Sequence, residues 1–98
     1  MFLAKVIGNV VATQKNARFQ GMKLLLIQPY ITREGKLVES GSSVVAVDSV
    51  GAGQGELVMF TQGSSARLTE ITKDSPTDTV IIGIVDTVEV AGRRVEKP

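Results

Sequence analysis

Short apolar stretches separated by polar turns run along the whole chain, and most of their residues are β-branched. Valine and isoleucine together number 21, against 7 leucines. β-Branched side chains pack well on pleated strands and lose rotamer freedom in helices. The pattern therefore predicts an all-β domain with five strands, over Phe2–Thr13, Lys23–Ile31, Val44–Val50, Glu56–Thr61 and Val80–Val90.

Glycine and proline indicate where these strands bend or end. Gly8 lies inside the first strand, which predicts a bulge or a barrel corner at that position. Pro29 lies near the end of the second strand, so we expect it at a sheet edge or at the exit of the strand. After this strand, Gly35 supplies the positive φ that a tight turn over Thr32–Lys36 needs.

The segment before the last strand is predicted to hold a single helical turn. Ser64–Glu70 opens on serines that can cap a helix, and Lys73–Thr79 is rich in turn residues. Five strands with one short helical insertion are typical of a small Greek-key barrel of the oligonucleotide/oligosaccharide-binding (OB) type. We expect residues 1–91 to form this one barrel domain and residues 92–98 to form a charged C-terminal tail.

Composition restricts the chemistry that such a barrel could perform. The 98 residues include no cysteine and no histidine, which excludes disulfides, thiolate and imidazole catalysis and nearly every transition-metal site. The net charge is +1, so there is no electrostatic case for nucleic acid or an anionic membrane as partner. The N-terminal stretch has the pattern of neither a signal peptide nor a membrane span, which makes the cytoplasm the expected compartment.

The cluster Gly51, Gly53 and Gly55 was tested as a phosphate-binding loop. A dinucleotide fingerprint requires a glycine three residues after Gly53, where this chain has Glu56. A Walker loop requires Gly-Lys-Ser/Thr, which does not follow. We interpret the glycines instead as positions of positive φ, or of close backbone approach between two strands or two subunits.

The segment Gly63–Arg67 was tested as a nucleophilic serine motif. It lacks the closing glycine of G-x-S-x-G, and the chain has no histidine to act as the base. The favoured interpretation is a helix N-cap, with Arg67 paired to a carboxylate such as Asp48 or Glu56.

Two functional alternatives stay open here: a hydrolase that uses paired carboxylates, and a monomeric OB-type module that binds single-stranded nucleic acid. The latter would rely on four aromatic residues and a small basic cluster, namely Phe2, Phe19, Tyr30 and Phe60 with Lys15, Arg18 and Lys23.

Taken together, five blocks of sequence resemble the EutN/CcmL family, the vertex proteins of bacterial microcompartments. The sharpest block reads Val-Ala-Val-Asp-Ser-Val-Gly-Ala-Gly-Gln-Gly-Glu. The blocks cover nearly the whole chain in order, over Leu3–Lys15, Gly21–Pro29, Val45–Glu56, Gly63–Arg67, and Pro76–Asp78 with Ile81–Asp86. The turn region Thr32–Ser43 and the tail 92–98 match no block closely.

The resemblance implies a structural shell protein without enzyme activity, cofactor or metal. It implies a cyclic homopentamer that closes the five-fold vertices of a cytoplasmic shell whose facets are hexameric proteins. The blocks are more similar to metabolosome members than to carboxysomal ones. Two loops are implied to build the subunit interface and the opening at the five-fold axis: Asp48, Gly51, Gly53, Gly55 and Glu56 in the first, and Gly63, Ser64, Ser65, Ala66 and Arg67 in the second.

Overall fold

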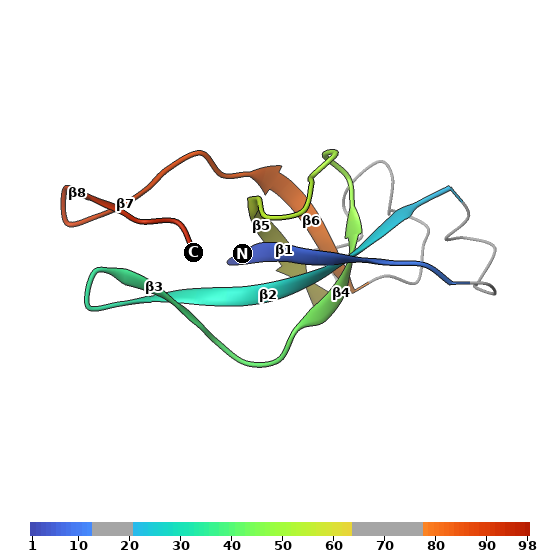
Figure 1. Cartoon of the computed structure of the whole chain (residues 1–98), viewed down its shortest axis with the longest axis horizontal. Coiled ribbons are helices and arrows are strands. Elements are labelled where there is room, and N and C mark those ends of the chain that lie inside the picture. Colours follow the sequence, from blue (N-terminus) through green and yellow to red (C-terminus); the bar gives the residue numbers. More distant parts are fainter. Residues whose placement is uncertain (13–20, 64–77) are drawn as a thin grey trace.

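A computed structural model describes residues 1–12, 21–63 and 78–98 of the chain. These residues form the strands β1 (Phe2–Val10), β2 (Lys23–Arg33), β3 (Lys36–Glu39), β4 (Val44–Asp48), β5 (Leu57–Gln62), β6 (Thr79–Ile84), β7 (Val88–Val90) and β8 (Arg93–Val95). Figure 1 shows the barrel strands crossing near the centre, while the β2–β3 and β7–β8 hairpins extend from the same side. Both termini lie near each other on that side.

Five strands close into a barrel. Their order around the ring is β1-β5-β6-β4-β2, and a further pairing of β1 with β2 joins the two ends. Only β4 and β6 pair in parallel, while the other barrel pairs are antiparallel. Such an order requires crossover connections, which define a Greek key, so the predicted five-stranded Greek-key barrel is confirmed. The predicted helical turn, Ser64–Glu70, lies outside the described residues.

The predicted bend in the first strand is confirmed. In the pairing of β1 with β2, Val6 lies opposite Ile27 and Gly8 lies opposite Leu26, so one residue of β1 has no opposite partner. An extra residue of this kind is a β-bulge, which sharpens the twist of the strand. The strand ends at Val10, three residues before the predicted end.

Pro29 is not at the exit of the strand, because β2 continues through it to Arg33, but it does lie at a local edge, with a strand partner on one side only. Pro29 lies opposite Ala4 of β1 and between the stretches of β2 that pair with β4 and with β3. Its carbonyl oxygen accepts a hydrogen bond from the Ser40 N–H at 3.0 Å. The nitrogen and oxygen of one strand residue face the same side, so the missing N–H of Pro29 faces away from β1 and interrupts no bond to it.

The turn after β2 is confirmed, and it leads into a strand that was not predicted. Glu34 and Gly35 both have positive φ, 53° and 75°, which is the requirement of a two-residue type I′ hairpin turn. β3 then pairs with the end of β2, from Arg33 opposite Lys36 to Tyr30 opposite Glu39. Its four residues are charged at both ends, so it is too short and polar to give a periodic signal.

The last predicted strand is too long and the tail is more ordered than predicted. β6 ends at Ile84, and the final bond to its neighbour runs from the Val85 N–H to the Leu57 carbonyl at 2.8 Å. The chain then bends and forms the β7–β8 hairpin. The segment 92–98 therefore contains a strand, and within it Val95 is only 5% exposed.

The core fills the inside of the barrel with apolar side chains from every barrel strand, nearly all of them aliphatic. Its largest fully buried members include Leu25, Ile27 and Ile81, each of which stabilises the fold by about 1.5–3 kcal/mol relative to exposure. One core member, Ala52, comes from the loop between β4 and β5 rather than from a strand. Among the described residues no helix is long and apolar enough to cross a membrane.

Candidate functional site: the glycine loop

Residues 49–56 connect β4 to β5 and are called the glycine loop below. At its start, the Ser49 hydroxyl donates to the Ile81 carbonyl at 2.6 Å. At its end, the Gly55 N–H donates to the Val6 carbonyl at 2.8 Å, and the Val6 N–H donates to the Glu56 carbonyl at 3.0 Å. The loop is therefore attached to β6 at one end and to β1 at the other.

Two of its three glycines are required by the backbone. Gly51 and Gly55 have φ of 78° and 89°, a region that L-residues with a Cβ rarely adopt, as predicted. Gly53 does not have a positive φ, and a Cβ there would lie 3.4 Å from Glu56 Oε1, an ordinary contact. The conformation of the subunit therefore gives no reason for a glycine at position 53.

Asp48 organises the loop from inside. Its side chain is only 1% exposed. Oδ1 accepts a hydrogen bond from the Val50 N–H at 3.1 Å, and Oδ2 accepts one from the Ala52 N–H at 2.9 Å. These bonds draw the chain around the carboxylate and place the Ala52 side chain in the core.

Lys23 completes this arrangement, and the sequence did not point to it. It begins β2 directly opposite Asp48. Its Nζ lies 3.7 Å from Asp48 Oδ2 and donates a 2.7 Å hydrogen bond to the Ala52 carbonyl. In the sequence Lys23 groups only with the basic residues Lys15 and Arg18 around the first loop. Only the register of two strands far apart in sequence shows that it faces Asp48.

Glu56 fixes the second half of the loop. Its Oε1 accepts the Gly53 N–H at 2.6 Å, while its own N–H donates to the Gly53 carbonyl at 3.2 Å. Both carboxylates of this site therefore bind loop N–H groups. Arg67, which was predicted to pair with one of them, lies outside the described residues.

The second predicted loop is described only at Gly63, which has a φ of 70°. The Gly63 N–H donates to the Asp78 carbonyl at 2.9 Å, which holds together the two ends of the segment between them. The other predicted interface residues, Ser64, Ser65, Ala66 and Arg67, lie outside the described residues. The structure therefore places five residues of the first loop together and leaves the second as a prediction.

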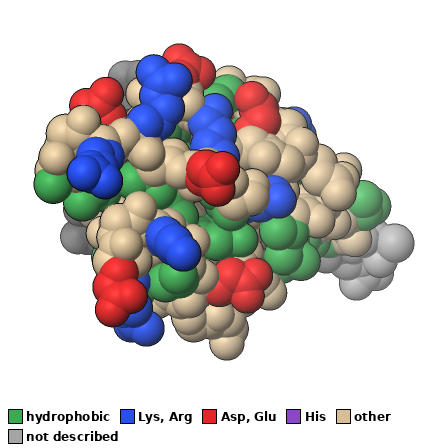
Figure 2. Space-filling model, turned by 60° about the vertical axis from the view of Figure 1, so that its left-hand side comes forward, with side chains coloured by type: hydrophobic (Ala, Val, Ile, Leu, Met, Phe, Trp, Pro, Cys, Tyr) green, Lys and Arg blue, Asp and Glu red, His purple; other side chains and the backbone are tan. Residues whose placement is uncertain are grey.

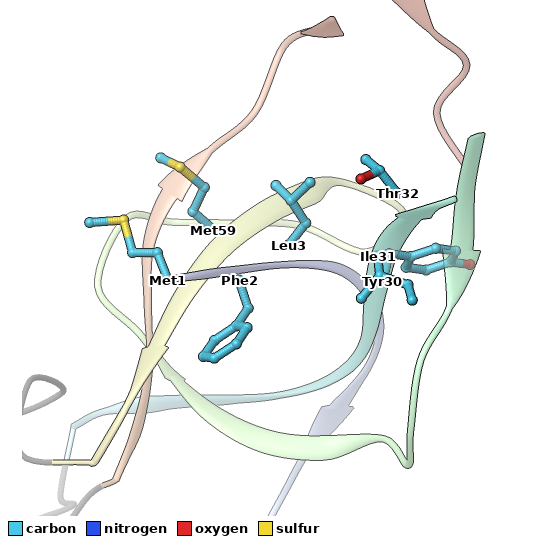
Figure 3. Close-up of a pocket in the computed structure, with 7 residues that line it drawn as sticks. All are labelled: Met1, Phe2, Leu3, Tyr30, Ile31, Thr32 and Met59. Carbon is cyan, nitrogen blue, oxygen red and sulfur yellow. The ribbon is translucent and has the colours of Figure 1, made fainter. Parts of the chain in front are cut away.

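A separate apolar groove of about 410 Å³ lies at one end of the barrel and is lined by Met1, Phe2, Leu3, Tyr30, Ile31, Thr32 and Met59. Figure 3 shows Leu3 and Met59 on one side of β1, with Phe2 pointing to the other. The Phe2 ring lies 5.4 Å from the Phe60 ring yet the residue is 52% exposed. The groove lining carries no charged side chain, so it is suited to apolar contact.

Charged side chains of both signs surround the apolar surface at this end of the molecule. Figure 2 shows lysine and arginine interspersed with aspartate and glutamate, rather than gathered in a continuous basic strip. In the described part of the chain, no group of three or more acidic residues is placed to hold a metal ion.

Comparison with known proteins identifies the family to which this chain belongs. Residues 1–86 match the family described as ethanolamine utilisation protein EutN/carboxysome. The chain belongs to the EutN/CcmL family. The match ends at the bend after β6, so β7 and β8 lie beyond it.

Members of the EutN/CcmL family with known roles are similar over nearly the full chain. The bacterial microcompartment shell vertex protein GrpN of Rhodospirillum rubrum is 48% identical over 91% of this chain and 97% of its own. The carboxysome shell vertex protein CcmL of Synechocystis is 45% identical, over 93% and 88%. The solved structure of the pentameric microcompartment shell protein GrpN from R. rubrum superposes with a TM-score of 0.79 at 47% identity, covering 93% and 99%.

Tyr30 is the titratable group whose surroundings predict a pH-dependent contribution to stability. Burial, and secondarily the negative charge of Glu39, raise the pKa of Tyr30 above its ordinary value of 10.0. The folded state thus holds the phenol proton more tightly than the unfolded state does. Its contribution to stability is complete below pH 10 and is lost as the pH rises from there through the folded-state pKa.

Replacing Tyr30 with phenylalanine should therefore reduce the loss of stability above about pH 10. Urea unfolding at pH 9 and pH 11 gives the loss of unfolding free energy for the wild type and for the variant. The titration of the lysines is common to both proteins, so it cancels when the two losses are subtracted. Because Tyr30 is the only tyrosine and there is no tryptophan, its ultraviolet ionisation curve gives the folded-state pKa directly. An ionisation midpoint below 10 would contradict the prediction.

Proposed function

We propose that this chain is a structural shell protein that forms cyclic homopentamers and closes the five-fold vertices of a bacterial microcompartment in the cytoplasm. The observation that carries the proposal is the likeness to pentameric GrpN, which extends over 93% of this chain at 47% identity. PduN of Salmonella typhimurium, also a microcompartment shell vertex protein, is 48% identical.

The surface of the separate subunit supports assembly. In a cyclic ring each subunit contacts its neighbours through two different surfaces. Large apolar side chains are available for such contacts, because several are 37–92% exposed in this 98-residue chain: Met1, Phe2, Ile7, Val11, Ile31, Val45, Val50 and Ile84. Burying part of this surface between subunits would favour the ring.

We place the seam between subunits and the opening at the five-fold axis at the glycine loop and at Gly63–Arg67. The subunit by itself does not require a glycine at position 53. The glycine there therefore supports a close approach of the neighbouring subunit. Hexameric facet proteins are the proposed outer partners. The metabolosome as the type of shell stays a prediction, since identity is 48% to GrpN and 45% to a carboxysome protein.

The proposed role requires no catalysis. The contacts of Asp48 and Glu56, the two carboxylates that bind the glycine loop, support a role without catalysis. Both Asp48 oxygens accept loop N–H bonds while the side chain is 1% exposed. Glu56 also accepts a loop N–H. A catalytic carboxylate needs access to substrate, which the buried Asp48 side chain lacks. Glu56 is exposed, and its Oε1 is engaged by the Gly53 N–H.

The native mass of the protein tests the proposal. Five copies of the 10.4 kDa chain should appear as one species of about 52 kDa, because a closed ring has a defined copy number. A monomer at micromolar concentration would contradict the proposal. Binding of single-stranded DNA that weakens steeply with salt would instead favour the nucleic-acid module.

A further inference from the structure

Contacts within a single subunit already fix the glycine loop. Asp48 binds the N–H groups of Val50 and Ala52, and Lys23 binds both Asp48 and the Ala52 carbonyl. The side chain of Lys23 is the link between β2 and the loop, and no contact with a neighbouring subunit is needed to form it. We call the contacts among Lys23, Asp48 and Ala52 the Lys23 clamp.

The Lys23 clamp matters because the loop would otherwise be costly to order. A loop with three glycines has more backbone conformations to lose than a loop of the same length without them. If the neighbouring subunit had to order it, that entropy would be subtracted from the free energy of association. A loop held in advance by charged hydrogen bonds avoids most of this loss at assembly.

We infer that Lys23 is a positioning residue for ring assembly, holding the glycine loop in its assembled conformation before the neighbouring subunit binds. The inference rests on the proposed pentamer and adds the residue that prepares its seam. Lys23 need not touch the neighbour, since it acts through Asp48 and Ala52. Its 50% exposed side chain leaves the barrel core intact when it is replaced.

Lys23→Met tests the inference, because methionine keeps the apolar stem and removes the ammonium group. We expect the subunit concentration at which half the pentamer dissociates to rise about tenfold or more, as loss of a charged hydrogen bond does. Lys23→Arg should recover most of the loss, since a guanidinium can bind the carboxylate and the carbonyl together. Lys36→Met is the matched control: it removes the same charge at the start of β3, on the hairpin that extends away from the barrel.

Hydrogen exchange supplies a readout of the loop itself. In wild type the amides of Val50 and Ala52 should exchange slowly, and in Lys23→Met faster, while amides of β1 and β5 in the barrel stay protected. Analytical ultracentrifugation over a dilution series measures assembly, and circular dichroism measures folding of the dissociated subunit.

Each result decides the matter. Unchanged dissociation in Lys23→Met, or equal weakening in Lys36→Met, would overturn the inference. So would unfolding of the dissociated Lys23→Met subunit, since Lys23 would then support the barrel rather than position the loop. A wild-type protein that is monomeric at all concentrations would instead refute the pentamer. The oligomeric state of the wild type is therefore measured before any variant is made.

Discussion

Replacing Asp48 with alanine should lower the thermal unfolding midpoint by roughly 10–20 °C, measured by circular dichroism at a fixed subunit concentration. The variant leaves the Val50 and Ala52 N–H groups without their acceptor. Ala52 is fully buried, so its N–H has no access to water. An unsatisfied buried donor together with the lost Lys23 contact costs about 2–3 kcal/mol, which corresponds to this shift for a domain of about 100 residues.

Asp86→Ala is the matched control, because Asp86 is an exposed aspartate in the bend after β6. Its midpoint should change by at most a few degrees, since an exposed substitution away from such networks changes stability by about 0.5 kcal/mol or less. Asp48→Asn should fall between the two, because one amide oxygen can still accept a single N–H. Equal midpoints for Asp48→Ala and Asp86→Ala would show that the loop does not depend on its carboxylate.

Replacing Gly53 with valine should abolish the pentamer while leaving the subunit folded. Gly53 does not have a positive φ, and an added Cβ meets only Glu56 Oε1 at 3.4 Å. The backbone and the space at position 53 therefore accept a Cβ, and we expect the barrel to fold with valine there. If the neighbouring backbone approaches closely, the two valine methyl groups overpack the seam by about 1–3 kcal/mol. The penalty applies at all five seams, so the ring is lost at micromolar concentration.

Native mass spectrometry should show the species of about 52 kDa replaced by the 10.4 kDa subunit. Gly53→Ala is the matched control: it adds only the Cβ, and we expect a weakened but detectable pentamer. Circular dichroism of the Gly53→Val subunit should match that of wild type. A Gly53→Val pentamer of normal stability would place the seam away from this loop.

The strands that close the barrel could be predicted because their signal is local. The β-branched residues of β1 and β6, the bulge at Gly8 and the positive φ at Gly35 all follow from the side chains or the turn itself. β3 and β8 could not be predicted in this way, because each is three or four residues long and charged. Short polar strands form only where a neighbouring strand offers its edge.

Pro29 shows that even a strong local signal depends on the neighbouring strands. Proline in a strand predicts an edge or an end because it cannot donate to a neighbour. Here it lies between the stretches of β2 that pair with β4 and with β3, where no strand residue needs its missing N–H and its carbonyl oxygen accepts the Ser40 N–H. Which side of a strand is free at one residue depends on the arrangement of all its neighbours.

The sequence by itself determined the all-β class and the small five-stranded barrel, since strand and turn signals depend on residue type and local conformation, and its five blocks indicated the family. Which of Gly51, Gly53 and Gly55 have positive φ was left to the structure. Only the tertiary structure decided what holds the candidate site. Asp48 and Lys23 are 25 positions apart and meet because β2 and β4 pair in one register. Charge pairing across a sheet is set by that register, which no spacing along the chain encodes.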